Sequence, residues 1–218
     1  TLDKYIGDAI MAFWGAPVGD ADHALHAAQA ALAMIGRMEG LNRELRARSL
    51  PEIGLGIGIN TGLVCVGDMG SDIRRSYTVM GDAVNLASRI EALTRVYGID
   101  VLLGEATREA IGARLPLVEV DRVRVKGKQQ AVTLFTPPVQ AQAEQPRYAE
   151  EVRLWNLALA AYRRQDAEQA LTSLAALQGG FGDSALSGLY RQLGERIARW
   201  PEHPEPPDWD GTRTFDSK

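Results

Sequence analysis

The chain has 218 residues, of which 45% are hydrophobic and 24% charged, so it can bury the core of one medium-sized domain and carry an appendage. Its net charge of −4, from 24 basic and 28 acidic side chains, argues against a general nucleic-acid-binding protein. The sequence contains no run of 18 apolar residues and no signal peptide, so no segment is expected to span a membrane.

The first stretch, KYIGDAIMAFWGAP at residues 4–17, predicts a β-hairpin. Gly7 and Asp8 make its turn, and residues 9–14 are expected to form a buried apolar strand. Lys4 and Asp8 flank this turn. A solvated hairpin tip explains such a pair more often than a phosphate or metal site does, so the hairpin alone leaves both interpretations open.

A long amphipathic helix is predicted next, because apolar residues recur at helical spacing from Ala24 to about Arg48. We expect it to pack on a sheet. His23 and His26 share one face of it, but no third ligand is evident, so surface or packed histidines are favoured over a metal site.

Residues 53–67, IGLGIGINTGLVCVG, predict a glycine-rich strand, a turn and a returning strand. The alternating glycines leave one face of the first strand nearly bare, so a packed helix or a partner subunit can approach it closely. The helix is the simpler interpretation. Cys65 lies in the apolar run LVCVG and is expected in the core; a lone thiol also fits a reducing compartment.

Residues 68–76 are expected to form a polar loop and residues 77–80 a short strand. A helix follows at residues 83–97, with Asp82 as its N-cap and Gly98 just after its end.

Asn85 and Arg89 stand four residues apart in that helix, so they project from one side. An amide and a guanidinium side by side can grip an anionic, oxygen-rich ligand, although a solvated polar face is the usual explanation of one such pair.

Strands are predicted at residues 99–103, 117–125 and 131–135, with a short helix at 105–111. Lys126 and Lys128 flank a glycine at the tip between the last two strands. Such a tip suits phosphate binding, but on its own it suits a solvated turn better.

The sequence divides into a domain at 1–137, a polar linker at 138–147, a helical appendage at 148–200 and a proline-rich tail at 201–218 that is expected to be loosely ordered. Three helices are predicted in the appendage, and the first two resemble one tetratricopeptide repeat. A single copy is too few for a free-standing unit, so these helices should pack against the domain or mediate contacts.

Four motifs, KYIGD, GINTG, YTVMGDAVNLASR and VKGK, occur in this order. Together they resemble the class III nucleotidyl cyclase catalytic domain, bacterial adenylate cyclases above all, over residues 1–137. The resemblance implies an α/β fold, an α+β sandwich of ferredoxin-like type, that lacks its first strand and helices here. It implies a head-to-tail homodimer with shared active sites, which converts ATP to 3′,5′-cyclic AMP and pyrophosphate with two divalent ions, Mg²⁺ or Mn²⁺.

The same resemblance gives three residues a place around the base and the metal. Lys4 would donate to N1 of adenine, and Thr78 would accept from the adenine amino group, which favours ATP over GTP. Asp8 corresponds to the second metal-binding aspartate. Lys4 and Asp8 would then serve different active sites of the dimer.

Four further residues correspond to the groups around the ribose and the phosphates. Asn85 would orient the ribose, and Arg89 would stabilise the charge that grows at the α-phosphorus. Lys126 or Lys128 would hold the terminal phosphates, with Lys126 favoured.

The family's first metal-binding aspartate has no counterpart in this chain. We therefore expect a parent protein that is a cyclase and a fragment that is inactive alone. The ending PPDWDGTRTFDSK resembles that of membrane-anchored bacterial cyclases, which implies a cytoplasmic catalytic domain with an anchor and a sensor domain upstream.

Four alternatives remain open. They are an inactive cyclase-homology dimerisation module, a guanylate cyclase, a diguanylate cyclase and a helical protein-binding adaptor. Asp8, Asn85 and Arg89 disfavour the first, and Lys4 with Thr78 disfavours the second. The glycine-rich acidic signature of the third is missing, and the fourth needs more repeats.

Overall fold

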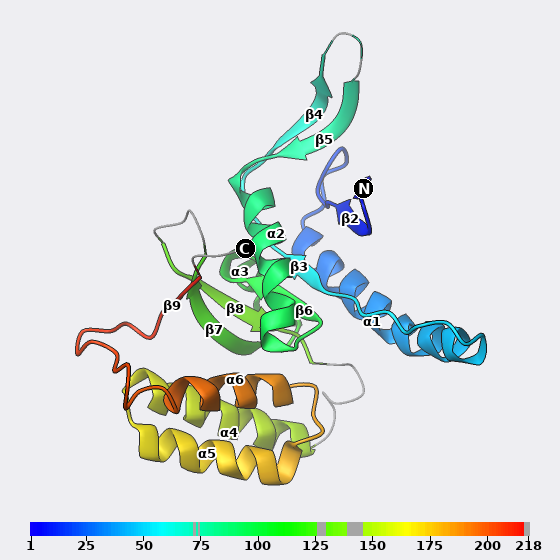
Figure 1. The fold of residues 1–218 in the computed structure, drawn as a ribbon. Helices are drawn as coiled ribbons and strands as arrows, with labels where there is room; N and C mark the ends of the chain where they lie inside the picture. Colours follow the sequence, from blue (N-terminus) through cyan, green and yellow to red (C-terminus); the bar gives the residue numbers. More distant parts are fainter. Residues whose placement is uncertain (72, 74, 126–129, 139–145, 216–218) are drawn as a thin grey trace.

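The computed structural model describes residues 1–71, 73, 75–125, 130–138 and 146–215 (Figure 1). Its strands are β1 (Leu2–Ile6), β2 (Ala9–Ala12), β3 (Ile57–Ile59), β4 (Cys65–Gly70), β5 (Arg75–Met80), β6 (Val101–Gly104), β7 (Val118–Arg124), β8 (Val132–Thr136) and β9 (Arg213–Thr214). Its helices are α1 (His23–Ala47), α2 (Asp82–Tyr97), α3 (Glu105–Ile111), the 3₁₀ helix η1 (Gly112–Arg114), α4 (Pro146–Arg163), α5 (Ala167–Phe181) and α6 (Ser187–Ile197).

The centre of the fold is a five-stranded sheet in the order β3-β6-β8-β7-β9. β3 runs parallel to β6 and β9 parallel to β7, whereas β8 is antiparallel to both of its neighbours. Successive side chains of β6 point to opposite faces. Val101 and Leu103 therefore pack with α1, while Leu102 belongs to the larger core with α2 and the C-terminal helices. The expected mixed α+β fold, with helices on a multi-strand sheet, is confirmed.

The glycine-rich strand lies directly against α2, as the simpler interpretation of its bare face predicted. A Cβ added at Gly58 would lie only 2.3 Å from the Glu91 nitrogen and 2.4 Å from the Ala87 oxygen, both backbone atoms of α2. The strand itself is shorter than expected, because only Ile57–Ile59 pairs with a neighbour.

The predicted first hairpin is present as the antiparallel pair β1–β2, and Gly7 turns it with φ of 65°. The expectation of a buried second strand is wrong, since the Ile10 side chain is 55% exposed. β1–β2 forms a separate two-stranded sheet rather than an edge of the central sheet, so its apolar side chains remain uncovered by the described residues.

β4 and β5 form an antiparallel ribbon that extends away from the central sheet (Figure 1). Strand pairing continues through Met69 and Ser76, which were expected to lie in a loop. Cys65 is exposed, so its assignment to the core is wrong. Its run of apolar neighbours lies in a ribbon outside the two hydrophobic cores of the described residues.

The three C-terminal helices form where they were predicted and pack on the sheet. The indole nitrogen of Trp155 in α4 donates a hydrogen bond of 2.6 Å to the backbone oxygen of Glu119 in β7. The prediction of a loosely ordered tail is wrong for residues 209–215. Trp209 packs edge-on to Tyr162 at 5.0 Å between ring centroids, and β9 then pairs with β7.

None of the helices in the described part of the chain is both long and apolar enough to cross a membrane.

Candidate active site

The strands β1 and β5 bring Lys4 and Thr78 together. The Lys4 ammonium donates a hydrogen bond of 2.9 Å to the Thr78 hydroxyl. Thr78 is 4% exposed, whereas the Lys4 side chain is 42% exposed. The buried Thr78 hydroxyl therefore holds an accessible Lys4 ammonium, which suits recognition of a ligand that presents a hydrogen-bond acceptor.

A third residue, Asp3, completes this group and was not predicted. The Thr78 hydroxyl donates a hydrogen bond of 2.6 Å to one Asp3 oxygen, and the Lys4 ammonium lies 3.4 Å from the other. The Asp3 side chain is only 1% exposed. The buried Asp3 carboxylate balances the charge of the partly exposed Lys4 ammonium, and such charge-assisted hydrogen bonds are stronger than neutral ones.

A β-bulge explains why adjacent residues of one strand reach the same hydroxyl. Leu2 pairs with Ala12 and Lys4 with Met11, so Asp3 is the extra residue of β1 and has no partner in β2. In a regular strand Asp3 and Lys4 would point to opposite faces, and a bulge can re-aim a side chain. Sequence alternation therefore gave no signal of Asp3 beyond a carboxylate beside Lys4.

Asn85 and Arg89 lie one turn apart on α2. Asn85 is exposed and Arg89 partly exposed, and neither side chain hydrogen-bonds or pairs with another described residue. Gly81, rather than the predicted Asp82, is the N-cap, and Gly98 ends the helix in the left-handed conformation with φ of 64°. The Asn85 amide and the Arg89 guanidinium are therefore available to bind an oxygen-rich ligand.

Asp8 lies exposed in the turn between β1 and β2. Its carboxylate can supply one hard oxygen ligand to Mg²⁺ or Mn²⁺. The described residues contain no group of three or more His, Cys, Asp and Glu side chains that could hold a metal ion. Within them no hydrogen bond or ion pair joins Asp8 to Lys4, Thr78 or Arg89. Lys126 and Lys128 lie outside the described residues.

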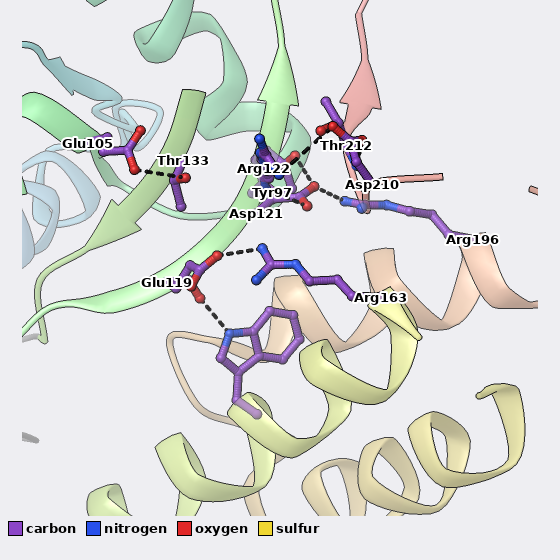
Figure 2. Close-up of polar contacts among 11 residues, drawn as sticks. Tyr97, Glu105, Glu119, Asp121, Arg122, Thr133, Arg163, Arg196, Asp210 and Thr212 are labelled. Atoms are coloured by element: carbon purple, nitrogen blue, oxygen red, sulfur yellow. Dashed lines mark hydrogen bonds and ion pairs between the residues drawn. The ribbon is translucent and has the colours of Figure 1, made fainter. Parts of the chain in front are cut away.

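The C-terminal end of α2 is tied to the C-terminal helices by a buried polar network (Figure 2). The Tyr97 hydroxyl donates to Asp121 at 2.6 Å, and the Arg196 guanidinium of α6 lies 2.7 Å from the same carboxylate oxygen. Burial, followed by the Asp121 charge, raises the pKa of Tyr97 well above its ordinary value. A register shift between Glu119 and Asp121 turns this aspartate inward, which sequence alternation did not indicate.

A polar hollow beside this network is lined by residues of mixed charge (Figure 2). Arg163 pairs with Glu119, and Arg122 lies 3.9 Å from Asp210. These opposite charges face one another across the junction between the C-terminal helices, the tail and β7.

Residues 4–137 match the family model described as the adenylate and guanylate cyclase catalytic domain. Adenylate cyclase 1 of Rhizobium meliloti (strain 1021) is 38% identical over 135 residues, which are 62% of this chain and 20% of that protein. An adenylate cyclase of Anabaena cylindrica is 41% identical over 145 residues, 62% of this chain and 27% of that protein. The chain thus spans 20% of the first relative and 27% of the second.

Solved structures of both nucleotide specificities are similar to the chain. The guanylyl cyclase Cya2 matches with a TM-score of 0.57 and 35% identity over 62% of this chain and 68% of that one. The adenylyl cyclase CyaB from P. aeruginosa matches with a TM-score of 0.56 and 32% identity over 62% of this chain and 69% of that one. Overall similarity therefore does not distinguish an ATP-specific from a GTP-specific enzyme. The side chains that would face the base have to be compared instead.

Proposed function

The chain belongs to the adenylate and guanylate cyclase catalytic domain family, and on that premise we propose that it is the catalytic domain of an adenylate cyclase, which converts ATP to 3′,5′-cyclic AMP and pyrophosphate. The observation that carries the choice of ATP is the contact between Lys4 and Thr78. It pairs a hydrogen-bond donor with a hydroxyl acceptor on neighbouring strands.

Adenine matches that pair in polarity. Its N1 atom accepts a hydrogen bond, which Lys4 can donate, and its amino group donates one, which Thr78 can accept. Guanine carries a hydrogen on N1 and an acceptor at the amino position, so both contacts would be mismatched. Leaving buried polar groups mismatched costs far more than losing an apolar contact.

Asn85 and Arg89 act on the sugar and the phosphates in this proposal. Asn85 holds the ribose so that its 3′-oxygen faces the α-phosphorus, and Arg89 stabilises the negative charge that grows there. A preorganised donor of this kind is commonly worth about 3–4 kcal/mol. Their freedom from other described partners supports these roles. The assignment of the terminal phosphates to Lys126 or Lys128 remains a prediction from the sequence.

Divalent ions, Mg²⁺ or Mn²⁺, would lower the pKa of the attacking hydroxyl and neutralise the triphosphate when bound. In this chain Asp8 would hold one of them. The family resemblance implies a further metal-binding aspartate that has no counterpart among the motifs of this chain, so we propose that residues 1–218 alone do not turn over ATP. Clear cyclic AMP formation by the 218-residue chain with ATP and Mn²⁺ would contradict this part of the proposal.

A head-to-tail homodimer follows from the same assignment. Each active site would combine Asp8 of one chain with Lys4, Thr78, Asn85 and Arg89 of the other. Exposed apolar side chains before β4 and between β4 and β5 support an interface. Leu63 is 97% exposed and Ile73 is 98% exposed. Apolar surface of this kind is typical of protein interaction sites.

Complementation tests the shared site in the whole protein that contains these residues. Asp8→Ala and Arg89→Ala should each abolish activity. In a dimer of one chain of each variant, both changes fall in one site and the other site stays intact. About half of the dimers in an equal mixture are of this kind, so mixing should restore about a quarter of the wild-type rate. Failure to recover activity, with mixed dimers demonstrated by mass, would contradict the shared site.

The choice of base is tested by the substitution pair Lys4→Glu and Thr78→Cys. The altered protein should shift from ATP towards GTP by roughly 10–100-fold for each contact in the ratio of kcat/KM values, since a hydrogen bond to a charged or buried group is worth about 1.5–3 kcal/mol. A guanylate cyclase is the second candidate, favoured by the similarity to Cya2. Wild-type protein that already prefers GTP would establish it.

A further inference from the structure

We propose that Asp3 is a specificity-determining positioning residue: it fixes the direction of the Thr78 hydroxyl so that this hydroxyl can only accept a hydrogen bond from the base. This inference rests on the proposed function, because it concerns how the same site reads adenine. It adds a residue that touches neither substrate nor metal in the scheme above.

The hydrogen bonds around Thr78 leave the hydroxyl a single free function. A threonine hydroxyl has one proton to donate and two lone pairs to accept with. The proton goes to the Asp3 carboxylate at 2.6 Å, and one lone pair receives the Lys4 ammonium at 2.9 Å. One lone pair remains, so the hydroxyl can receive the adenine amino group but cannot donate to the oxygen of guanine.

Asp3 can impose this direction because it is buried and lies close to both partners. A carboxylate that faces an ammonium accepts hydrogen bonds, so the proton between Thr78 and Asp3 comes from the Thr78 hydroxyl. The Asp3 side chain is 1% exposed, and its second oxygen has no hydrogen-bond partner in the described residues and lies 3.4 Å from the Lys4 nitrogen. The same carboxylate therefore balances the Lys4 charge and helps to aim the ammonium at the base.

Without Asp3 the Thr78 hydroxyl becomes free to rotate. It could then donate its proton as easily as accept one, and the site would lose its discrimination at the amino position. The bulge in β1 is what makes the arrangement possible, since it brings Asp3 and Lys4 to one hydroxyl. A bulge beside a binding site with a re-aimed side chain is a functional device rather than a packing irregularity.

The test compares ATP with purine riboside triphosphate, which lacks the amino group but keeps N1, in the whole protein that contains these residues. The ratio of kcat/KM for the two nucleotides isolates the Thr78 contact and does not depend on the fraction of enzyme that folds. Asp3→Ala should lower this ratio roughly tenfold, the scale of one charge-assisted hydrogen bond. Asp3→Asn, which keeps one acceptor oxygen, should lower it less.

A second comparison uses the Thr78→Val background, in which Asp3→Ala should have no further effect on the ratio. Glu39→Ala, an exposed acid on α1, is the matched control and should leave the ratio unchanged. An active Asp3→Ala enzyme with an unaltered ratio, or one whose ratio falls equally in the Thr78→Val background, would overturn the role of Asp3. Wild-type protein that makes no cyclic AMP would instead remove the proposed function itself.

Discussion

A methyl group added at Gly58 should push α2 off the sheet. The new Cβ would lie 2.3 Å from the Glu91 nitrogen, 2.4 Å from the Ala87 oxygen and 2.7 Å from the Glu91 Cα. All three are backbone atoms, so no side-chain rotation can relieve the contact. To restore ordinary van der Waals separation, α2 must retreat by about 1 Å in an interior that is close-packed.

The magnitude follows from two opposing effects. Overpacking of a core usually costs about 1–3 kcal/mol, and a clash with backbone belongs at the upper end. Replacing a strand glycine by alanine recovers about 0.5–1 kcal/mol of backbone entropy. The free energy of unfolding should therefore fall by about 2–3 kcal/mol, which lowers Tm by roughly 4–12 °C in a domain of this size.

The shift should also reach the active site, because Arg89 lies on α2 between Ala87 and Glu91. A misplacement of about 1 Å can cost roughly 100-fold in rate. Thermal unfolding followed by circular dichroism and cyclic AMP formation by the whole protein are the two assays. Activity should fall in Gly58→Ala by more than the folded fraction does.

Gly54→Ala is the matched control. It adds the same methyl group to the same glycine-rich segment, but no atom lies within 4 Å of the new Cβ. Its stability should stay within about 0.5 kcal/mol of wild type. If Gly58→Ala melts like Gly54→Ala and keeps full activity, α2 does not lie on β3 as described.

The remaining predictions concern the C-terminal helices. Arg196→Met should lower the free energy of unfolding by about 3–5 kcal/mol in denaturant titration, because it leaves the buried Asp121 carboxylate without its cation; a loss below about 1 kcal/mol would contradict this. Tyr148→Phe should leave the free energy of unfolding unchanged or raise it at pH 7, since that hydroxyl is buried without a hydrogen-bond partner among the described residues. Tyr190→Phe removes a hydrogen bond to the buried Glu151 carboxylate and should lower the free energy of unfolding by about 1.5–3 kcal/mol. Burial raises the pKa of Tyr148 from 10.0 to about 12. The unfolded state therefore loses this proton first, and the free energy of unfolding falls by up to about 2–3 kcal/mol as the pH rises from 10 towards 12. Tyr148→Phe should lose correspondingly less stability over this pH range, and a loss equal to that of the wild type would refute the prediction.

The elements with strong local signals could be predicted from the sequence. The helical period and the glycine after Tyr97 predicted α2, and the alternating glycines predicted the close contact of a helix with β3. The contact between Lys4 and Thr78 bridges 74 residues of sequence. The family resemblance, rather than periodicity, placed these two residues in one site.

The features that were missed depend on register or on distant partners. Asp3 and Asp121 point where they do because of shifts in strand pairing, which side-chain alternation does not contain. Cys65 has the apolar neighbours of a core residue, but its strand pairs in an outlying ribbon. The tail has the proline content of a loose segment, and Trp209 nevertheless anchors it on Tyr162.

The most direct test of the central claim is a competition assay. The whole protein that contains these residues is given equal concentrations of ATP and GTP with Mn²⁺, and the cyclic products are quantified by mass spectrometry. The arrangement of Lys4 and Thr78 predicts that 3′,5′-cyclic AMP is the main product. Cyclic GMP as the main product would contradict the account of the site.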